Sequence, residues 1–371
     1  MRSIVFVAAL FSGCDDVSNS PSISRKVSKP LGGGDPAKPQ EDVAGTVTKP
    51  LGGGNPIKPH EDVAVGLSPR DISQGCQQYF ARGQHAGGQV RPRPEPACFG
   101  QIPGDAAGNV AAVNVVFIRH AQSEWNKAYE EAHRRFLPRD PHLLDAHLSD
   151  LGIDQSLALA KAIESGSLAY LSEDDKSILR GQQVAGRRSI FASSNLRRAT
   201  LTLLIAFRRI FLNPTPGGPR IHVLSSLQER GSIDAQSLTS IGDRPYLTLK
   251  DRCPFKEDKL KDVFETCCND GNEMRRRIDL QANTCTWIRR RALEGVTDFV
   301  LVGHSNWLGS FFQAFSANGQ DASDPAHLLA AHTKLSNAGM IKFRFSTGPL
   351  GDCRIVPGTT VVANGDIKYG N

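Results

Sequence analysis

The sequence has no apolar run long enough to cross a membrane. The apolar segment at residues 4–11 holds eight residues, whereas a membrane-spanning helix needs about 20. Because this segment follows Arg2 and precedes small residues, it predicts a secretory signal over residues 1–13. A chance apolar patch in a disordered start is the alternative. We therefore expect that the protein has no membrane partner and that it is secreted or enters the secretory pathway. A cytoplasmic location is the alternative.

Metal-binding patterns of cysteine and histidine are also missing. The eight cysteines form no CxxC pair and no Cys/His spacing typical of zinc, so the sequence predicts no metal and no other cofactor. Four of the cysteines lie within residues 253–285. They could pair as disulfides in a secreted chain or remain free thiols in the cytoplasm, and the sequence leaves both open.

A strong excess of charge is lacking as well. The formal net charge is +6 and the isoelectric point is about 8.9. The basic residues are dispersed and no aromatic-rich basic motif accompanies them, which argues against a nucleic-acid partner. A small anionic substrate fits this balance, whereas the oligomeric state cannot be read from it.

Residues 14–109 are rich in proline and glycine and poor in apolar periodicity, so they cannot bury enough surface to offset the entropy of ordering. They contain a tandem repeat: "VSKPLGGGDPAKPQEDVAG" begins at Val27 and "VTKPLGGGNPIKPHEDVAV" at Val47. The GGG and KP elements break regular structure, and no GK[ST] follows as in a phosphate-binding loop. This region is predicted to be a disordered linker, followed by one globular domain over residues 110–371.

Within that domain, strand and helix patterns alternate. Apolar strands are expected at residues 113–118, 188–194, 221–227 and 298–304, with helices at 147–165, 195–211 and 305–315. Near-continuous apolar strands indicate a mostly parallel sheet covered on both faces. We expect a three-layer α/β/α sandwich with a doubly wound central sheet, closing edge strands at 339–346 and 358–365, and an inserted cap at about 231–297.

Four of these strands end in polar residues. Arg119 and His120 follow the first strand, Arg198 follows the second by four residues, Glu229 follows the third, and His304 ends the fourth. Each alone would be ordinary, since charged residues end many strands and buried histidines are often structural. Because the carboxyl ends of parallel strands meet at one edge, we expect these side chains to converge.

The converging residues suit a phosphoryl group. Arginine guanidinium groups bind phosphate oxygens in pairs, and Arg198 lies in the first turn of a helix opened by Ser194 or Asn195, where free N–H groups favour an anion. Asn126 adds a neutral donor at the start of another helix. A pocket of this kind favours a dianion.

The same residues could also cleave a phosphate ester. A neutral His120 could attack phosphorus while a protonated Glu229 gives its proton to the leaving oxygen. Arg119, Arg198 and His304 could neutralise the oxygens of the phosphoryl group, so no metal is needed.

Several motifs resemble one known family. "RHAQSEWN" resembles the RHGxSxxN signature of the histidine phosphatase, or phosphoglycerate mutase-like, superfamily, and "SNLRRATLT" is similar to its SxLxRAxxT block. "LQERG", "VLVGHSN" and "LSDLGIDQS" are similar to further segments of that family, over residues 113–345. The resemblance assigns the second phosphate arginine to Arg198 and not to Arg197, the acid to Glu229, the second histidine to His304 and a substrate contact to Ser123.

The resemblance implies a metal-independent phosphomonoester phosphatase that acts on a small phosphorylated substrate through a phosphohistidine. Ala121 departs from the usual glycine, and the GW-x-D element of the mutases is missing, which favours a phosphatase. A mutase and a catalytically weak phospho-ligand-binding protein are the alternatives. In the cap, a helix is expected to carry Ile278, Ala282, Cys285 and Ile288 on one face, and residues 275–277 could reach a multiply phosphorylated substrate.

Overall fold

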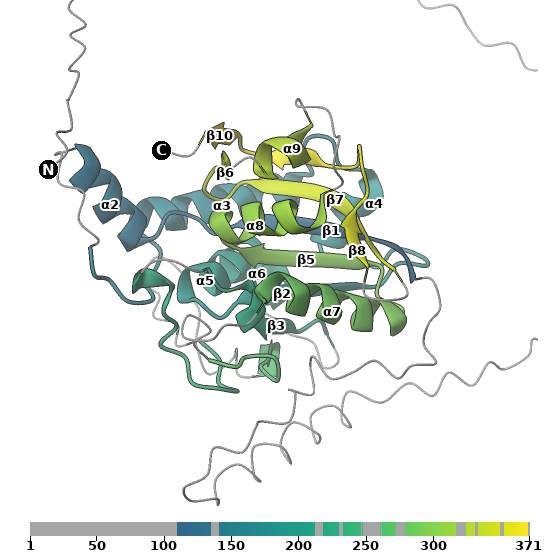
Figure 1. Ribbon diagram of the computed structural model, residues 1–371, viewed down its shortest axis with the longest axis horizontal. Coiled ribbons are helices and arrows are strands. Elements are labelled where there is room, and N and C mark those ends of the chain that lie inside the picture. Colours follow the sequence, from purple (N-terminus) through teal and green to yellow (C-terminus); the bar gives the residue numbers. More distant parts are fainter. Residues whose placement is uncertain are drawn as a thin grey trace, which may run out of the picture. The chain divides into compact units, whose positions relative to one another are not determined.

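The computed structural model describes the globular part of the chain (Figure 1). The described residues are 110–134, 141–211, 218–229, 233–245, 247, 260, 262–271, 279–316, 324–330, 333–348 and 352–369, all within one compact unit, Ala64–Asn371. The predicted signal, the predicted linker and residues 275–277 lie outside them. Among the described helices, none combines the length and apolar character that a membrane span requires.

An eight-stranded mixed sheet forms the centre of the domain. Its strands are β1 (Val110–Arg119), β2 (Ser189–Ser194), β3 (Ile221–Leu224), β4 (Phe264–Glu265), β5 (Asp298–Gly303), β7 (Met340–Thr347), β8 (Cys353–Ile355) and β9 (Val361–Asn364). The order is β4-β3-β2-β5-β1-β7-β8, with β9 also paired to β7. The first five strands in this order are parallel, and β7 runs antiparallel to β1. A second sheet joins β6 (Thr333–Leu335) to β10 (Ile367–Tyr369).

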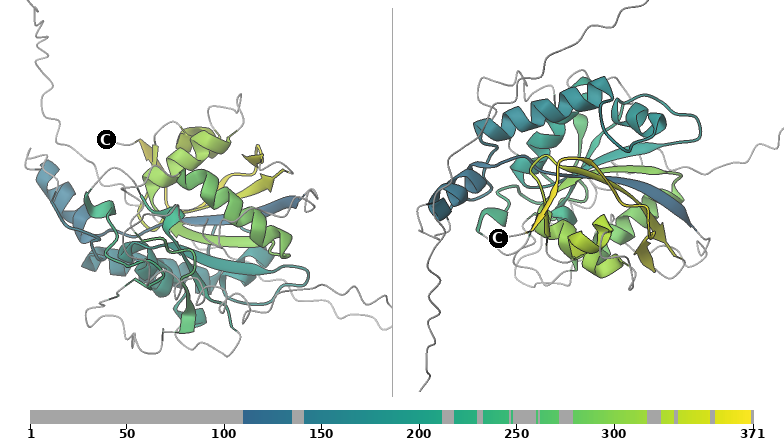
Figure 2. Two further views of the ribbon diagram at one scale, coloured as in Figure 1. Left: turned by 60° about the horizontal axis from the view of Figure 1, so that its bottom comes forward. Right: turned by 90° about the horizontal axis from the view of Figure 1, so that it is seen from above.

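Helices cover both faces of the sheet (Figure 2). One face carries α3 (Asp150–Ser165), α4 (Glu173–Leu179), α5 (Arg197–Ala206) and α6 (Arg208–Phe211). The other carries α7 (Leu280–Leu293), α8 (Ser305–Phe315) and α9 (Pro325–Ala330). Short 3-10 turns are η1 (Ser225–Leu227) and η2 (Ile233–Ala235). The predicted three-layer sandwich with a mostly parallel sheet is confirmed.

The apolar run of β1 follows from its central position. Val116 and Ile118 pack into the core on the α3 and α5 side, whereas Val115 and Phe117 pack into the core on the α7 and α8 side. Because successive side chains of a strand point to opposite faces, burial of both faces requires a continuous apolar sequence.

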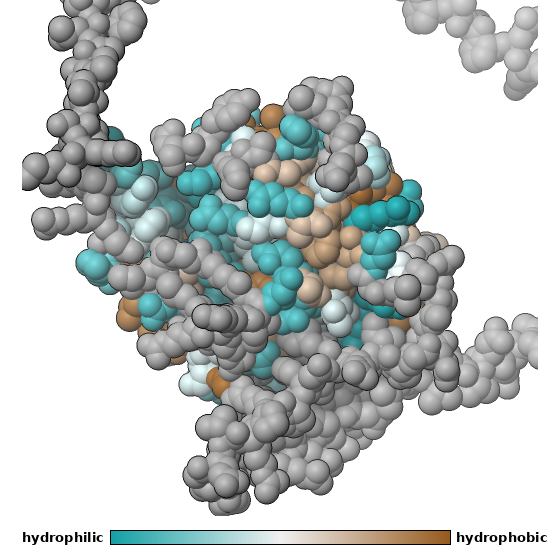
Figure 3. Space-filling model, viewed as in Figure 1, coloured by the Kyte–Doolittle hydropathy of each residue, from teal (hydrophilic) through white to brown (hydrophobic). Residues whose placement is uncertain are grey.

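The helices match their patterns with one break. Ser149 caps α3 by accepting from the Gly152 N–H, and Ile153, Ala160 and Ile163 are buried along one face. The single helix predicted over residues 195–211 is divided into α5 and α6 at Phe207. By contrast, α2 (Glu124–Arg134) has no buried residue, and hydrophilic residues cover its surface in Figure 3.

One prediction about the edge strands is wrong. Residues 339–346 are not an edge strand, because β7 lies between β1 and its antiparallel neighbours β8 and β9. Within the predicted cap segment, α7 packs on the central sheet through Leu280, Trp287 and Ile288. Of the residues expected on one face of this helix, Cys285 and Ile288 are buried and Ala282 is exposed, because the buried face of α7 is shifted towards Thr284 and Trp287.

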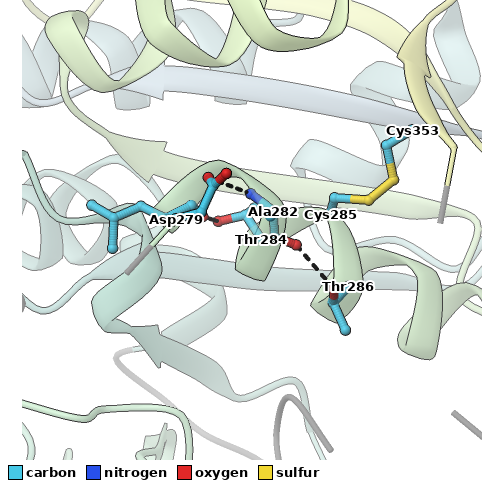
Figure 4. Close-up of a disulfide and its surroundings, with 7 residues drawn as sticks. Asp279, Ala282, Thr284, Cys285, Thr286 and Cys353 are labelled. Carbon is cyan, nitrogen blue, oxygen red and sulfur yellow. Dashed lines mark hydrogen bonds between the residues drawn. A yellow bond between two sulfur atoms is a disulfide. The ribbon is translucent and has the colours of Figure 1, made fainter. Parts of the chain in front are cut away.

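A disulfide joins α7 to β8. Figure 4 shows Cys285 on the helix bonded to Cys353 on the strand, and Cys267 and Cys268 are disulfide-bonded too. Cys353, the partner of Cys285, lies outside the cysteine cluster at residues 253–285. The spacing of the cysteines in the sequence does not indicate this pairing. A bond that closes a loop of 68 residues restricts the unfolded chain and stabilises the fold by a few kcal/mol.

Candidate active site

Two histidines meet at the carboxyl edge of the parallel sheet. His120 follows β1 and His304 follows β5, and these strands pair in register from Asn114 and Asp298 up to Arg119 and Gly303. Their ring centroids are therefore only 4.9 Å apart. Both side chains are buried, with 2% and 0% of their surface exposed.

Hydrogen bonding fixes which nitrogen of His120 carries the lone pair. Nδ1 lies 2.7 Å from the carbonyl oxygen of Ala121. A carbonyl only accepts, so Nδ1 holds the proton and donates it. Nε2 is then the basic nitrogen, and it accepts from Arg198 Nε at 3.3 Å. Burial, followed by the positive charges of Arg198 and Arg119, lowers the pKa of His120 well below its ordinary value, which keeps this nitrogen nucleophilic.

Arg198 is the centre of the polar network. It is fully buried, and besides His120 it contacts two acids. Nη2 lies 3.1 Å from Glu229 Oε2 and 3.1 Å from Asp234 Oδ2, while Nη1 donates to the Asp234 backbone carbonyl at 3.0 Å. The guanidinium thus links the nucleophile candidate to the acid candidate.

The neighbouring Arg197 points elsewhere. Its Nε donates to the carbonyl of Asp145 at 2.7 Å, and its backbone N–H donates to the Asp145 carboxylate at 2.8 Å. The helix cap is Leu196 in an extended conformation, not Ser194 or Asn195 as predicted. An anion does lie at the start of α5, but it is the buried carboxylate of Asp145, whose pKa burial raises.

Glu229 and His304 form the other side of the pocket. Glu229 Oε2 lies 3.6 Å from His304 Nδ1, and His304 Nε2 lies 3.0 Å from Ser194 Oγ. Burial raises the pKa of Glu229, although Arg198 opposes this shift. Burial also lowers the pKa of His304 well below its ordinary value, with Arg198 as the next cause. A protonated carboxyl group beside a neutral imidazole is suited to proton donation.

Arg119 ends β1 at the same edge. Its Nη1 donates to the carbonyl of Leu335 at 2.6 Å, and among the described residues its Nε has no hydrogen-bond partner. Burial lowers its pKa, and the charge of Glu229 raises it. The side chain is anchored on one side and keeps donor capacity on the other.

Ser123 and Asn126 contact each other. The Ser123 hydroxyl donates to Asn126 Oδ1 at 3.0 Å and accepts from the Asn126 N–H at 3.1 Å, and the Ser123 N–H donates to the same Oδ1 at 3.1 Å. These bonds cap the start of α2. Phosphate binding by Asn126 and substrate binding by Ser123 stay predictions, because the described contacts of both serve the helix.

The backbone that follows His120 is held by residues of the motifs "LSDLGIDQS" and "SNLRRATLT". The Gln122 N–H donates to Gln155 Oε1 at 2.9 Å, and the Ala121 N–H donates to Thr202 Oγ1 at 3.0 Å. A side chain at Gly152 would meet the Gln122 carbonyl oxygen at 1.9 Å. Ala121 is not among the described residues with positive φ, so alanine fits where the family motif has glycine.

We expect Gly152→Ala to lower both stability and activity. The added methyl group must displace the Gln122 carbonyl by more than an ångström, and overpacking of this kind typically costs about 1–3 kcal/mol. Urea unfolding and phosphatase assays would measure the two losses. Gly309→Ala in α8 is the matched control, because its Cβ would meet the nearest backbone oxygen at an ordinary 3.4 Å. Equal effects of the two substitutions would contradict this account.

The side chains of His120, Glu229 and His304 could in principle bind a metal ion, since their ligand atoms lie within 4.8 Å of one another. However, the Arg198 guanidinium donates to both His120 and Glu229. A cation there would face this positive charge, whereas an anion would be stabilised by it. The electrostatics favour an anionic ligand.

Two buried acids of this site are missing from the sequence prediction. Asp234 contacts Arg198, and Asp145 joins the start of α5 to the loop at Leu238, whose N–H donates to its carboxylate at 3.1 Å. Asp145 has a φ of 41°, unusual for a residue other than glycine. Both are single acids in irregular segments, so no periodicity or motif marks them.

Comparisons with known proteins describe a general likeness only. No family model matches the chain, and no curated protein does. A mycobacterial glucosyl-3-phosphoglycerate phosphatase structure is 19% identical over 69% of this chain and 100% of its own, with a TM-score of 0.37. A putative alpha-ribazole-5'-P phosphatase from Escherichia coli is 12% identical over 70% of this chain and 100% of its own, with a TM-score of 0.35.

A phosphoserine phosphatase structure from Entamoeba histolytica, solved with 3-phosphoglyceric acid, shows a similar degree of likeness. It is 16% identical over 70% of this chain and 98% of its own, with a TM-score of 0.31. At these identities and TM-scores the likeness carries no weight for activity. The functional conclusion therefore depends on the geometry of the site itself.

Proposed function

We propose that this protein is a metal-independent phosphomonoester phosphatase of the histidine phosphatase superfamily, acting through a phosphohistidine on His120. One observation carries the proposal: the Ala121 carbonyl holds the proton on Nδ1, which leaves Nε2 basic beside Arg198 and on the same side as Glu229. Arg198, the proposed phosphate ligand, thus contacts both the proposed nucleophile and the proposed acid.

In the first step, the Nε2 lone pair of His120 attacks phosphorus. The N–P bond forms as the bond from phosphorus to the ester oxygen breaks, and Glu229 transfers its proton to that oxygen, so that an alcohol leaves. Arg198, Arg119 and His304 bind the remaining phosphoryl oxygens, where the negative charge is concentrated.

In the second step, water attacks the phosphohistidine. Glu229, now a carboxylate, accepts a proton from the water as the new P–O bond forms. The N–P bond breaks, its electron pair returns to Nε2, and inorganic phosphate leaves. The acid is protonated again, so the cycle closes without a metal or another cofactor.

The decisive test is the Glu229→Gln variant with two kinds of ester. Glutamine cannot donate a proton, so kcat/KM on an alkyl phosphate should fall roughly 10²-fold. On a nitrophenyl phosphate, whose leaving group needs no protonation, the loss should be much smaller. Release of inorganic phosphate, followed with and without EDTA, measures both, and EDTA should have no effect.

Three outcomes would contradict the proposal. Equal losses on the two esters would remove Glu229 as the acid, and inactivation by EDTA would point to a metal. Conversion of the substrate with no release of phosphate would instead indicate a mutase. The matched control for Glu229→Gln is Glu124→Gln, which makes the same change at the partly exposed start of α2. Gln228→Glu is not a useful control, because Gln228 is fully buried.

We also propose that the protein works in an oxidising compartment. Disulfides persist in such compartments and are rare in the cytoplasm, and Cys285–Cys353 is one of the bonds in the described part of the fold. This supports the secretory route over the cytoplasmic one.

A further inference from the structure

Two acids share one nitrogen of the Arg198 guanidinium. Nη2 lies 3.1 Å from Glu229 Oε2 and 3.1 Å from Asp234 Oδ2, and the side chains of the two acids are 12% and 3% exposed. The reaction proposed above uses one acid only. The second acid, within contact of the phosphate-binding arginine, therefore needs an explanation of its own.

The charges around Glu229 are unequal. Arg198 from α5, Arg119 from β1 and Asp234 from η2 all act on it, and the His304 ring, at the start of α8, lies 3.6 Å away. If both acids were ionised, two negative charges would face each other across a single nitrogen. Two carboxylates that share one partner nitrogen favour a state in which one of them keeps a proton.

The two acids contact Arg198 unequally. Asp234 engages Arg198 at two nitrogens, since Nη2 contacts its carboxylate and Nη1 donates to its backbone carbonyl. Glu229 engages Arg198 at one nitrogen only. The position of Asp234 is also fixed by its segment, because Gln228 Nε2 donates to the carbonyl of Ala235.

We propose that Asp234 is a positioning residue: its carboxylate holds the Arg198 guanidinium against His120, and its negative charge keeps the proton on Glu229 until the leaving oxygen takes it. This inference rests on the proposed function. Asp234 itself makes and breaks no bond, and it acts on the reaction through Arg198 and Glu229.

The first test is the pH profile of kcat/KM in Asp234→Asn. Asparagine keeps the shape and an acceptor for Arg198 but removes the charge, so the pKa of Glu229 should fall. Because Glu229 must be protonated to act, activity is lost as the pH rises through this pKa. The alkaline limb should therefore move to lower pH, by about one unit for a charge at this distance.

Two further variants separate charge from position. Asp243→Asn makes the same change at an exposed site of the same segment and should leave the profile as in the wild type. Asp234→Ala should shift the limb and also lower kcat at its optimum, because Arg198 loses a contact. A limb that stays in place while Asp234→Asn lowers activity at every pH would overturn the inference.

An infrared titration provides a readout that needs no turnover. The carbonyl band of a protonated carboxyl group that is absent in Glu229→Gln belongs to Glu229, and its midpoint should fall in Asp234→Asn. An unchanged midpoint would overturn the inference even if the enzyme is active. Conversely, an inactive wild type with the expected shift would refute the proposed function and leave only the electrostatic coupling between Asp234 and Glu229 standing.

Discussion

Replacement of His120 by asparagine should abolish turnover and remove the phosphorylated enzyme. Asparagine has no basic nitrogen, so the N–P bond cannot form and the two-step reaction cannot take place. Loss of the nucleophile in enzymes that use covalent catalysis can reduce kcat by about 10⁴-fold or more. The pocket would still bind phosphate, because Arg198 keeps its contacts with Glu229 and Asp234.

Rapid-quench labelling with a phosphorylated substrate would measure this directly. The wild type should retain acid-labile phosphate on the protein, and His120→Asn should retain none. His133→Asn, an exposed histidine on α2, is the matched control and should behave as the wild type. Full activity of His120→Asn, or no acid-labile phosphoenzyme in the wild type, would exclude the phosphohistidine mechanism.

The architecture could be predicted from the sequence because burial on both sides leaves a clear pattern. Most residues of β1 and β5 are apolar, and the parallel register of the two strands brings Arg119 beside Gly303. The position of β7 could not be predicted, since short antiparallel partners from the end of the chain cover its outer edge. The partners follow β7 closely in the chain, but their pairing leaves no mark in the sequence of β7 itself.

The same difference separates the residues of the site. His120 and His304 follow recognisable strands, so their convergence could be foreseen from topology. Asp145 and Asp234 act through long-range contacts with Arg197 and Arg198 of α5, and such contacts have no period or spacing. The packing of α7 could not be foreseen for a related reason: a helix in a cap and a helix on the sheet can have the same sequence pattern, and only the contacts of α7 show that it lies on the sheet.

Arg198 and Arg197 are adjacent in sequence, yet their substitution should have opposite consequences. Arg198→Lys should lower kcat/KM roughly 10³-fold, because a lysine ammonium cannot reproduce a planar fork that contacts His120, Glu229 and Asp234 together. Inhibition by orthophosphate should weaken in parallel, since in the proposed mechanism the lost donors bind the phosphoryl oxygens.

Arg197→Lys should cost stability more than catalysis. Arg197 binds the Asp145 carbonyl and His147, away from the reacting groups, so its loss should loosen the loop at residues 141–149 and lower kcat/KM by less than tenfold. Thermal unfolding of both variants, measured beside kcat/KM, separates the two effects. If Arg197→Lys impaired catalysis as much as Arg198→Lys at equal stability, Arg198 would lose its role as the phosphate ligand. A fall in kcat/KM that is much larger for Arg198→Lys than for Arg197→Lys at equal stability would instead support Arg198 as the phosphate ligand.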